Sequence, residues 1–195
     1  MSGIDATTLA LVKEHLVKTS TAEDALLTTL IRAVSAQVEA YLITPLFESE
    51  RTEFYDAVEG AHDIWLLSVP VNGVSEARID TTWAFATTSI ISANLYRIDR
   101  ATGRLYFSNS LPEGPGVVQV RYTGGLAATT ADLVAKFPDV ALAATQQVGE
   151  LYRRRGNASA TGRGGGQGGI SYPKGLVLLD VVRELLDPHR RLVIS

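Results

Sequence analysis

The sequence predicts an α+β fold, in which both chain ends form a helical bundle and an antiparallel β-module is inserted between them. Three observations support this prediction. Apolar residues recur at helical spacing in 1–47 and 124–195, alternating and β-branched runs fill 48–123, and glycine- and proline-rich turns separate these runs. We therefore expect the order helix, helix, β-module, helix, hinge, helix, without an internal repeat.

The composition fits a globular protein. Of the 195 residues, 46% are hydrophobic and 20% are charged, and the net charge is −3. This balance lacks the overall basic character of a nucleic-acid binder. The chain contains no cysteine, which excludes disulfides, thiolate zinc sites and cysteine nucleophiles. No apolar run approaches the roughly 18 residues of a membrane span.

Two helices are expected before the β-module. Asp5 is predicted to cap the first helix. Ser20 and Glu23 have capping-box spacing for the second, which should end near Thr44-Pro45. Both patterns are amphipathic and closely joined, so we expect an antiparallel pair.

The β-module should contain six strands, because six short runs alternate or are rich in β-branched residues. They are 51–55, 63–67, 74–80, 95–99, 104–107 and 117–122. Turn residues lie at Asn72-Gly73, at 101–103 and at 112–116, and the segment 95–107 is the clearest hairpin.

Helical spacing returns at the C-terminal end. Pro138 suits the first turn of a helix over 140–155, which a glycine-rich hinge, 156–169, and a C-terminal arm, 170–195, follow. In the arm, polar residues occupy only one narrow stripe of the predicted helix 176–186. A surface helix normally has the reverse proportion. This helix therefore needs apolar cover on several sides, from its own body or from a neighbouring subunit.

Several stretches resemble the head-tail connector (adaptor, or head-completion) proteins of tailed bacteriophages, in their longer version with a β insertion. The similarity lies in the order and spacing of five patterns. These are the helix 26–42, the strand and Val-Pro-Val of 67–74, the Val-x-Val-x-Tyr-Thr-Gly-Gly of 118–125, the helix reaching Leu151-Tyr152-Arg153, and 185–191.

This resemblance implies a structural protein without catalysis, cofactor or metal. Such proteins form a ring, commonly of twelve subunits, under the portal after DNA packaging, and they extend the DNA channel toward the tail. The implied partners are the portal protein, a stopper or tail-completion protein, further copies of the chain and, transiently and without sequence specificity, DNA in the channel, but no membrane. The implied location is the head–tail interface of the virion, and the host cytoplasm during assembly.

The C-terminal arm is the first candidate site, as a helix that binds the portal or a neighbouring subunit in a groove. Its expected contacts are Tyr172, Leu176, Leu179, Val182, Leu185, Leu186, Arg190 and Arg191. The alternative is that this helix folds back onto its own bundle.

Clustered arginines form the second candidate site. Arg153, Arg154, Arg155 and Arg163 are expected to contact DNA in a channel or an acidic partner, because arginines neutralise phosphates and release counterions. The alternative is that the run lies at the end of a helix and stays solvated.

Aromatic residues of the β-module are the third candidate. Two tryptophans in a small β-module usually belong to its core, so Trp65 is expected there. Trp83 and Phe85, in the longer segment 81–94, are the expected exposed pair and could contact the next subunit or a tail component.

Two other functional classes stay open. A phage tail or baseplate component that recognises glycans would present Trp65 or Trp83 at its surface. An enzyme would need a pocket of titratable groups, and the sequence lacks a Gly-x-Ser-x-Gly elbow, a phosphate-loop ending to its glycine run, and metal spacing among His15, His62 and His189.

Overall fold

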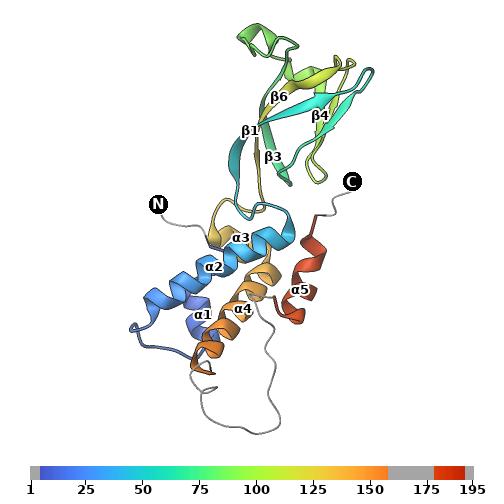
Figure 1. Ribbon diagram of the computed structural model, residues 1–195. Coiled ribbons are helices and arrows are strands. Elements are labelled where there is room, and N and C mark those ends of the chain that lie inside the picture. Colours follow the sequence, from blue (N-terminus) through green and yellow to red (C-terminus); the bar gives the residue numbers. More distant parts are fainter. Residues whose placement is uncertain (1–4, 158–177, 192–195) are drawn as a thin grey trace. The chain divides into compact units, whose positions relative to one another are not determined.

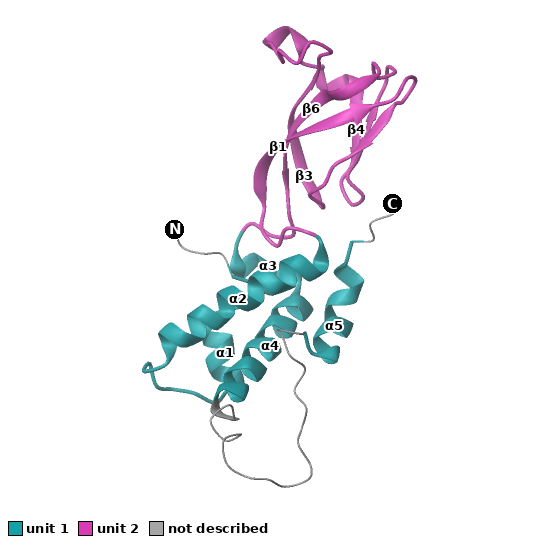
Figure 2. Cartoon of the chain, in the orientation of Figure 1, with its two compact units in different colours: residues 1–43, 129–195 teal, residues 44–128 magenta. Residues whose placement is uncertain are grey.

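The computed structural model describes residues 5–157 and 178–191. The chain divides into two compact units, a helical unit of residues 1–43 and 129–195 and a β unit of residues 44–128 (Figure 2). Helices fill the first unit and antiparallel sheets the second, which confirms the predicted α+β class (Figure 1). Most of the expected hinge, 158–169, lies outside the described residues.

The helical unit is built around one long helix, α4, which α1, α2, α3 and α5 all contact (Figure 1). Its elements are α1 (Leu9–His15), α2 (Asp24–Leu42), α3 (Thr130–Lys136), α4 (Pro138–Asn157), α5 (Asp180–Leu186) and the 3-10 turn η3 (Asp187–His189). Buried aliphatic residues of these helices, such as Val34, Leu133 and Val148, form the core.

The first helix begins later than predicted. Thr8, and not Asp5, is the N-cap of α1, and its Oγ1 accepts a hydrogen bond from the backbone N–H of Leu11 at 3.2 Å. The preceding residues cannot join the helix because they are tied into the unit. The N–H of Ala6 donates to Oγ of Ser35 at 2.8 Å.

The capping box predicted for the second helix is also absent. α2 starts at Asp24, and its N-cap, Glu23, makes no side-chain capping bond. The hydroxyl of Ser20 instead accepts from the N–H of Ala22 at 3.2 Å, within the turn. Glu23 is directed to α4, where it has partners that local spacing does not reveal.

The sequence prediction contains no counterpart of α3. Thr129 caps this helix, since its Oγ1 accepts from the N–H of Asp132 at 3.1 Å. Phe137 then leaves the helical region ahead of Pro138, as residues before proline tend to do. Pro138 opens α4, as predicted.

The β unit contains two three-stranded antiparallel sheets, ordered β1-β6-β3 and β2-β5-β4. The strands are β1 (Ser49–Ala57), β2 (Asp63–Trp65), β3 (Val71–Ile79), β4 (Tyr96–Asp99), β5 (Arg104–Phe107) and β6 (Gly114–Gly124). The predicted hairpin is confirmed as β4–β5.

The turn predicted at Asn72-Gly73 is wrong, because both residues lie inside β3 at a register irregularity. Val71 pairs with Gly124 and Gly73 pairs with Thr123, so Asn72 is the extra residue of a bulge. Its side-chain amide donates to the carbonyl of Gly125 at 3.2 Å.

One hydrophobic core joins the two sheets of the β unit. Val118, Val120 and Tyr122 of β6 share it with Leu105 and Phe107 of β5. Successive side chains of a strand point to opposite faces. The remaining face of each sheet therefore points away from this core, and the two outer faces lie on opposite sides of the unit.

Candidate functional site

The C-terminal helix packs on the chain's own helical unit. Leu178, Val182 and Leu186 recur at a four-residue spacing and are buried, and α5 contacts α4. The N–H of Leu179 donates to Oε1 of Gln147 on α4 at 3.1 Å. The described part of the arm thus adopts the folded-back arrangement, which corrects the expectation that Val182 and Leu186 are free to anchor another chain.

Polar contacts hold the end of this segment. The hydroxyl of Tyr41 on α2 bonds to Oδ1 of Asp187 at 2.5 Å, and Nε2 of His189 lies 2.6 Å from Oδ2 of Asp139 on α4. Burial raises the pKa of Asp139, but the bonds from His189 and from the backbone outweigh it, so that this pKa lies below its ordinary value. These contacts fix the segment to both α2 and α4.

The two arginines at the end of the arm lie beside α2. The guanidinium of Arg190 is 5.0 Å from the ring centroid of Tyr41, and the N–H of Arg191 donates to the carbonyl of Leu42 at 3.0 Å. Arg190 is exposed and Arg191 half-buried. Two further expected arm contacts, Tyr172 and Leu176, lie outside the described residues.

The docked helix keeps a second apolar face. Val181 is 48% exposed, and Leu185, four residues later on the same face, is half-buried. Leu179, the N-cap of α5, is also half-buried but does not share this face. Leu142 on α4, the helix that α5 contacts, is also exposed. These residues are accessible to a partner without any movement of α5.

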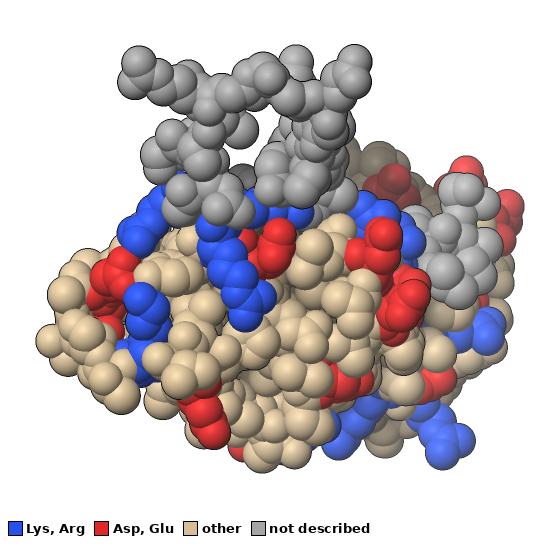
Figure 3. Space-filling view, turned by 90° about the horizontal axis from the view of Figure 1, so that it is seen from below, with Lys and Arg blue, Asp and Glu red and all other residues tan. Residues whose placement is uncertain are grey.

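The arginine cluster at the end of α4 is largely paired within the helical unit. Arg154 forms an ion pair with Glu150 at 2.9 Å, and Arg155 forms one with Glu23 at 2.6 Å, whereas Arg153 is exposed. Basic and acidic side chains also alternate on the face of the molecule seen in Figure 3. This arrangement matches the helix-end alternative for Arg154 and Arg155. Arg163 lies outside the described residues.

Glu23 joins the start of α2 to the end of α4. Its carboxylate accepts from the hydroxyl of Tyr152 at 2.5 Å and pairs with Arg155 and, at 3.3 Å, with Lys18. These three bonds, that of Tyr152 foremost, lower the pKa of Glu23 to about 2. The partners Tyr152 and Arg155 follow Glu23 by 129 and 132 positions.

The segment between β3 and β4 presents two aromatic side chains. Trp83 is 61% exposed, as expected, and Phe85 is half-buried. Both have positive φ angles, 59° and 44°, which are unusual for bulky residues. Asp80 holds this conformation, because its carboxylate accepts from the N–H and hydroxyl of Thr82, the N–H of Phe85 and the hydroxyl of Ser89 at 2.6–2.9 Å.

These bonds lower the pKa of Asp80 to about 2, with the bonds from Thr82 as the largest cause. The loop is therefore a defined structure with an ionised carboxylate at its base.

A hollow of about 420 Å³ opens beside this loop, on the outer face of the β1-β6-β3 sheet. We call it the Trp83 hollow. Its lining residues are Phe54, Trp83, Phe85, Pro115 and Gly116. Phe54 meets Phe85 edge to face at 5.4 Å between ring centroids, and Nε1 of Trp83 donates to the carbonyl of Pro115 at 2.9 Å. Phe54 is not among the residues predicted from the sequence, where its only signal is an apolar side chain that follows five polar residues, 49–53, of β1.

Trp65 does not belong to the core, which corrects the expectation for it. It is 51% exposed, because its neighbour Ile64 takes the inward position on β2. The guanidinium of Arg104 lies 5.4 Å from the Trp65 ring centroid and 4.2 Å from that of Tyr106, and Arg104 also pairs with Asp63 at 2.7 Å.

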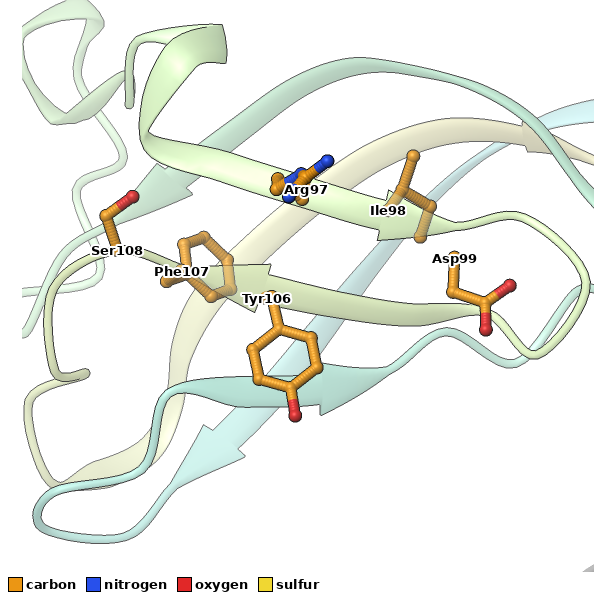
Figure 4. A pocket seen from close by; sticks show the side chains of 6 residues that line it. All are labelled: Arg97, Ile98, Asp99, Tyr106, Phe107 and Ser108. Carbon is orange, nitrogen blue, oxygen red and sulfur yellow. The ribbon is translucent and has the colours of Figure 1, made fainter.

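A second hollow, of about 490 Å³, lies along the hairpin that contains Tyr106 (Figure 4). It is lined by side chains of β4 and β5 and by Ser108. Among them are the charged Arg97 and Asp99 and the aromatic Tyr106 and Phe107. No catalytic arrangement of nucleophile, base and orienting group is formed by these lining residues.

Within residues 5–157 and 178–191, no cluster of three or more His, Asp and Glu side chains has the arrangement of a metal site. Nδ1 of His62 instead lies 3.3 Å from the carbonyl of Phe107. In that same part of the chain, no helix combines the length and apolar character needed to cross a membrane.

Comparison with known proteins gives one family and a set of similar structures. The family described as "Head completion protein" matches residues 5–192. Nine solved chains match, and no curated protein does. A chain from the neck of an empty gene transfer agent (GTA) particle, solved with C6 symmetry, is 22% identical with a TM-score of 0.65, over 100% of this chain and 95% of that one.

Two further chains are similar. One from the virion of a native GTA particle is 23% identical with a TM-score of 0.63, over 97% of this chain and 92% of that one. One from the neck of a native GTA particle, solved with C12 symmetry, is 22% identical with a TM-score of 0.61, over 100% and 95% of the two chains. At these identities the similarity shows a shared fold that includes both units.

Proposed function

This chain belongs to the head completion protein family, and we propose that it is a structural protein that completes the head of a tailed bacteriophage or related particle and connects it to the tail. The family match over residues 5–192 carries this proposal, because it includes both the helical and the β unit. Its mechanism is packing and geometry, without catalysis. Its place is the neck of the virion.

We further propose a ring, of twelve subunits, under the portal, with DNA passing through it. Two of the chains with the same fold come from particle necks solved with C6 and C12 symmetry, which supports a cyclic arrangement. A ring of identical subunits uses one heterologous contact that is repeated until it closes. Each contact can be weak when the neighbours and the portal hold it in place.

The C-terminal segment is the proposed contact with the portal. Its second apolar face, with Val181 and Leu185, is accessible while α5 stays docked, and Arg190 is exposed at its end. The exposed Arg153 at the end of α4 is the proposed non-specific contact with channel DNA. The tail side of the ring would bind a stopper or tail-completion protein.

Glycan recognition is the second candidate function, and the exposure of Trp65 and Trp83 favours it. Aromatic rings stack on sugars through their faces. The face of Trp65 is partly covered by Arg104, however, and the indole N–H of Trp83 is bonded to Pro115. A glycan array probed with the purified chain tests this function directly.

The test of the main proposal is native mass and negative-stain microscopy of the chain alone and with the portal protein of the same genome. We expect a closed ring, or a complex that forms only with the portal and is lost when residues 172–195 are removed. A chain that stays monomeric and ignores the portal would reject the connector role.

Adjacent leucines provide a matched pair of variants. Leu185→Asp changes the half-buried face of α5 and should leave an intact monomer that fails to assemble with the portal. Leu186→Asp introduces a charge into the core and should disrupt the packing of α5 itself. If Leu185→Asp also unfolds the monomer, the helix has no face available for a partner.

A further inference from the structure

We infer that the β unit carries both halves of a head-to-tail contact between copies of this chain. The ridge formed by Trp65, Leu67, Arg104 and Tyr106, here the Trp65 ridge, would enter the Trp83 hollow of the next copy. This inference rests on the ring proposed above and names the surfaces that build it.

The Trp83 hollow is preformed. Its three aromatic rings are fixed by contacts within the unit, namely the Phe54–Phe85 edge contact and the bond from Trp83 to Pro115. Trp83 and Phe85 keep positive φ angles, and four hydrogen bonds to Asp80 hold the loop in this shape. Backbone strain that the surroundings maintain is concentrated at functional sites. The loop in this conformation supplies two of the three aromatic rings that line the hollow.

The Trp65 ridge is also exposed and fixed. Leu67 is 61% exposed and follows Trp65 by two positions, and Tyr106 is exposed two positions after Arg104, the residue that pairs with Trp65. The N–H of Leu67 donates to the carboxylate of Glu53 and to the hydroxyl of Tyr55, both at 3.3 Å. Tryptophan, tyrosine and arginine dominate the binding energy of protein interfaces. The ridge combines all three beside an exposed leucine.

The two surfaces lie on opposite faces of the β unit. Phe54 pairs with Gln119 on the outer face of β1-β6-β3, whereas Arg104 and Tyr106 alternate with the buried Leu105 and Phe107 on β5. Because the two sheets share one core, their outer faces point in opposite directions. A contact between the ridge of one copy and the hollow of the next is heterologous. It leaves an unoccupied hollow at one end of the pair and an unoccupied ridge at the other. Such a contact continues from copy to copy until the ring closes.

Charge favours the same pairing. The hairpin 96–107 and the strand β2 of the ridge contain three arginines, Arg97, Arg100 and Arg104, against two acids, Asp99 and Asp63, of which Asp63 is paired with Arg104. The segments 54–60, 80–85 and 113–116, which supply or adjoin the hollow's lining, contain four acids and no lysine or arginine.

Two carboxylates are linked to the hollow directly. Asp80 accepts from Phe85, and Asp56 accepts from the N–H of Gly116 at 2.7 Å. Arg78, which donates to the carbonyl of Phe85, is already paired with Glu76. Opposite charges of this kind orient one copy on the next and disfavour contacts between like faces.

Thiol cross-linking tests this contact, because the chain contains no cysteine. One variant combines Leu67→Cys on the ridge with Pro115→Cys at the hollow, a change that keeps the backbone oxygen used by Trp83. Two variants carry one of these cysteines each. A control combines Leu67→Cys with Asn109→Cys, at an exposed loop position. Each is treated with a short bismaleimide, alone and with the portal protein.

We expect the double variant to give a ladder from dimer to full ring. Each single variant alone should stay monomeric on the gel, and their equimolar mixture should give dimers only. The control pair should give no ladder. Cross-linked dimers from one single variant would indicate a like-to-like contact and overturn the inference.

The outcomes separate this inference from the proposed function. A ring that forms by native mass without a 67–115 ladder overturns the ridge–hollow contact and leaves the ring proposal intact. A chain that forms no ring with or without the portal overturns both.

Discussion

Replacement of Leu186 by alanine tests whether the C-terminal helix is docked in solution. The side chain of Leu186 is fully buried, and it is one of three apolar side chains, with Leu178 and Val182, that bury this face of the segment. Leu→Ala at buried sites costs about 2–5 kcal/mol through lost burial and the cavity that remains. α5 has only seven residues, so the loss should fall mainly on its docking.

A loss of about 2 kcal/mol or more corresponds to a change of roughly 30-fold or more in the docking equilibrium. Hydrogen exchange measures this change in the peptide covering 178–191, where the N–H of Arg183 bonds to the carbonyl of Leu179. We expect its exchange to accelerate by that factor. Val181→Ala is the matched control, because Val181 is 48% exposed on the same helix, and it should change exchange about twofold or less.

Equal exchange in the two variants would refute the reasoning. It would mean that α5 spends little time on α4, and Val182 and Leu186 would then be available to another chain after all. A large effect of Leu186→Ala with none of Val181→Ala would establish the folded-back arrangement as the solution state.

Three further predictions follow from single contacts. The folded-state pKa of Asp80, about 2, lies below the unfolded value of 3.8. The stabilisation that ionised Asp80 gives the folded loop is therefore complete above pH 3.8 and is lost as the pH falls through 2. Trp83 fluorescence should change over that window, and should change less in Asp80→Asn. Tyr152→Phe should raise the pKa of Glu23 from about 2 toward 4.5, as an NMR titration would record, because the Tyr152 bond is the largest cause of its lowering; an unchanged pKa would contradict this. Gly125→Ala should destabilise the β unit by about 1–3 kcal/mol in urea unfolding, because the φ of Gly125 is +138° and an added Cβ would lie 2.5 Å from the backbone of Phe47. Gly73→Ala is the control: a Cβ added there has no heavy atom within 4 Å, so this variant should lose little stability.

Elements with local signals were predicted well. The β4–β5 hairpin follows from two short alternating runs around a turn with Gly103, whose φ is +75°. α4 follows from Pro138 and a long helical pattern. The same kind of local signal misled at Asn72-Gly73, where a tertiary bond from Asn72 to Gly125 keeps the chain in the strand.

The contacts that define the candidate surfaces were not accessible to sequence reasoning. Trp83 was singled out, but its partner Pro115 follows 32 positions later, and Phe54 meets Phe85 only because a loop folds over β1. Residue type alone predicts Trp65 in the core. Strand alternation decides its side instead, and the neighbouring Ile64 is the residue that faces inward.

The apolar excess of the C-terminal helix now has a structural explanation. One face, with Val182 and Leu186, is satisfied by the chain's own core, but Val181 and Leu185 form a second face four residues apart that the unit covers only in part. A helix with two apolar faces can hold its own bundle and a partner at once. Assembly then needs no release of α5, and the energy that docks the helix also positions the surface that we propose binds the portal. This is why substitutions at Leu185 and Leu186, although adjacent, should separate assembly from stability.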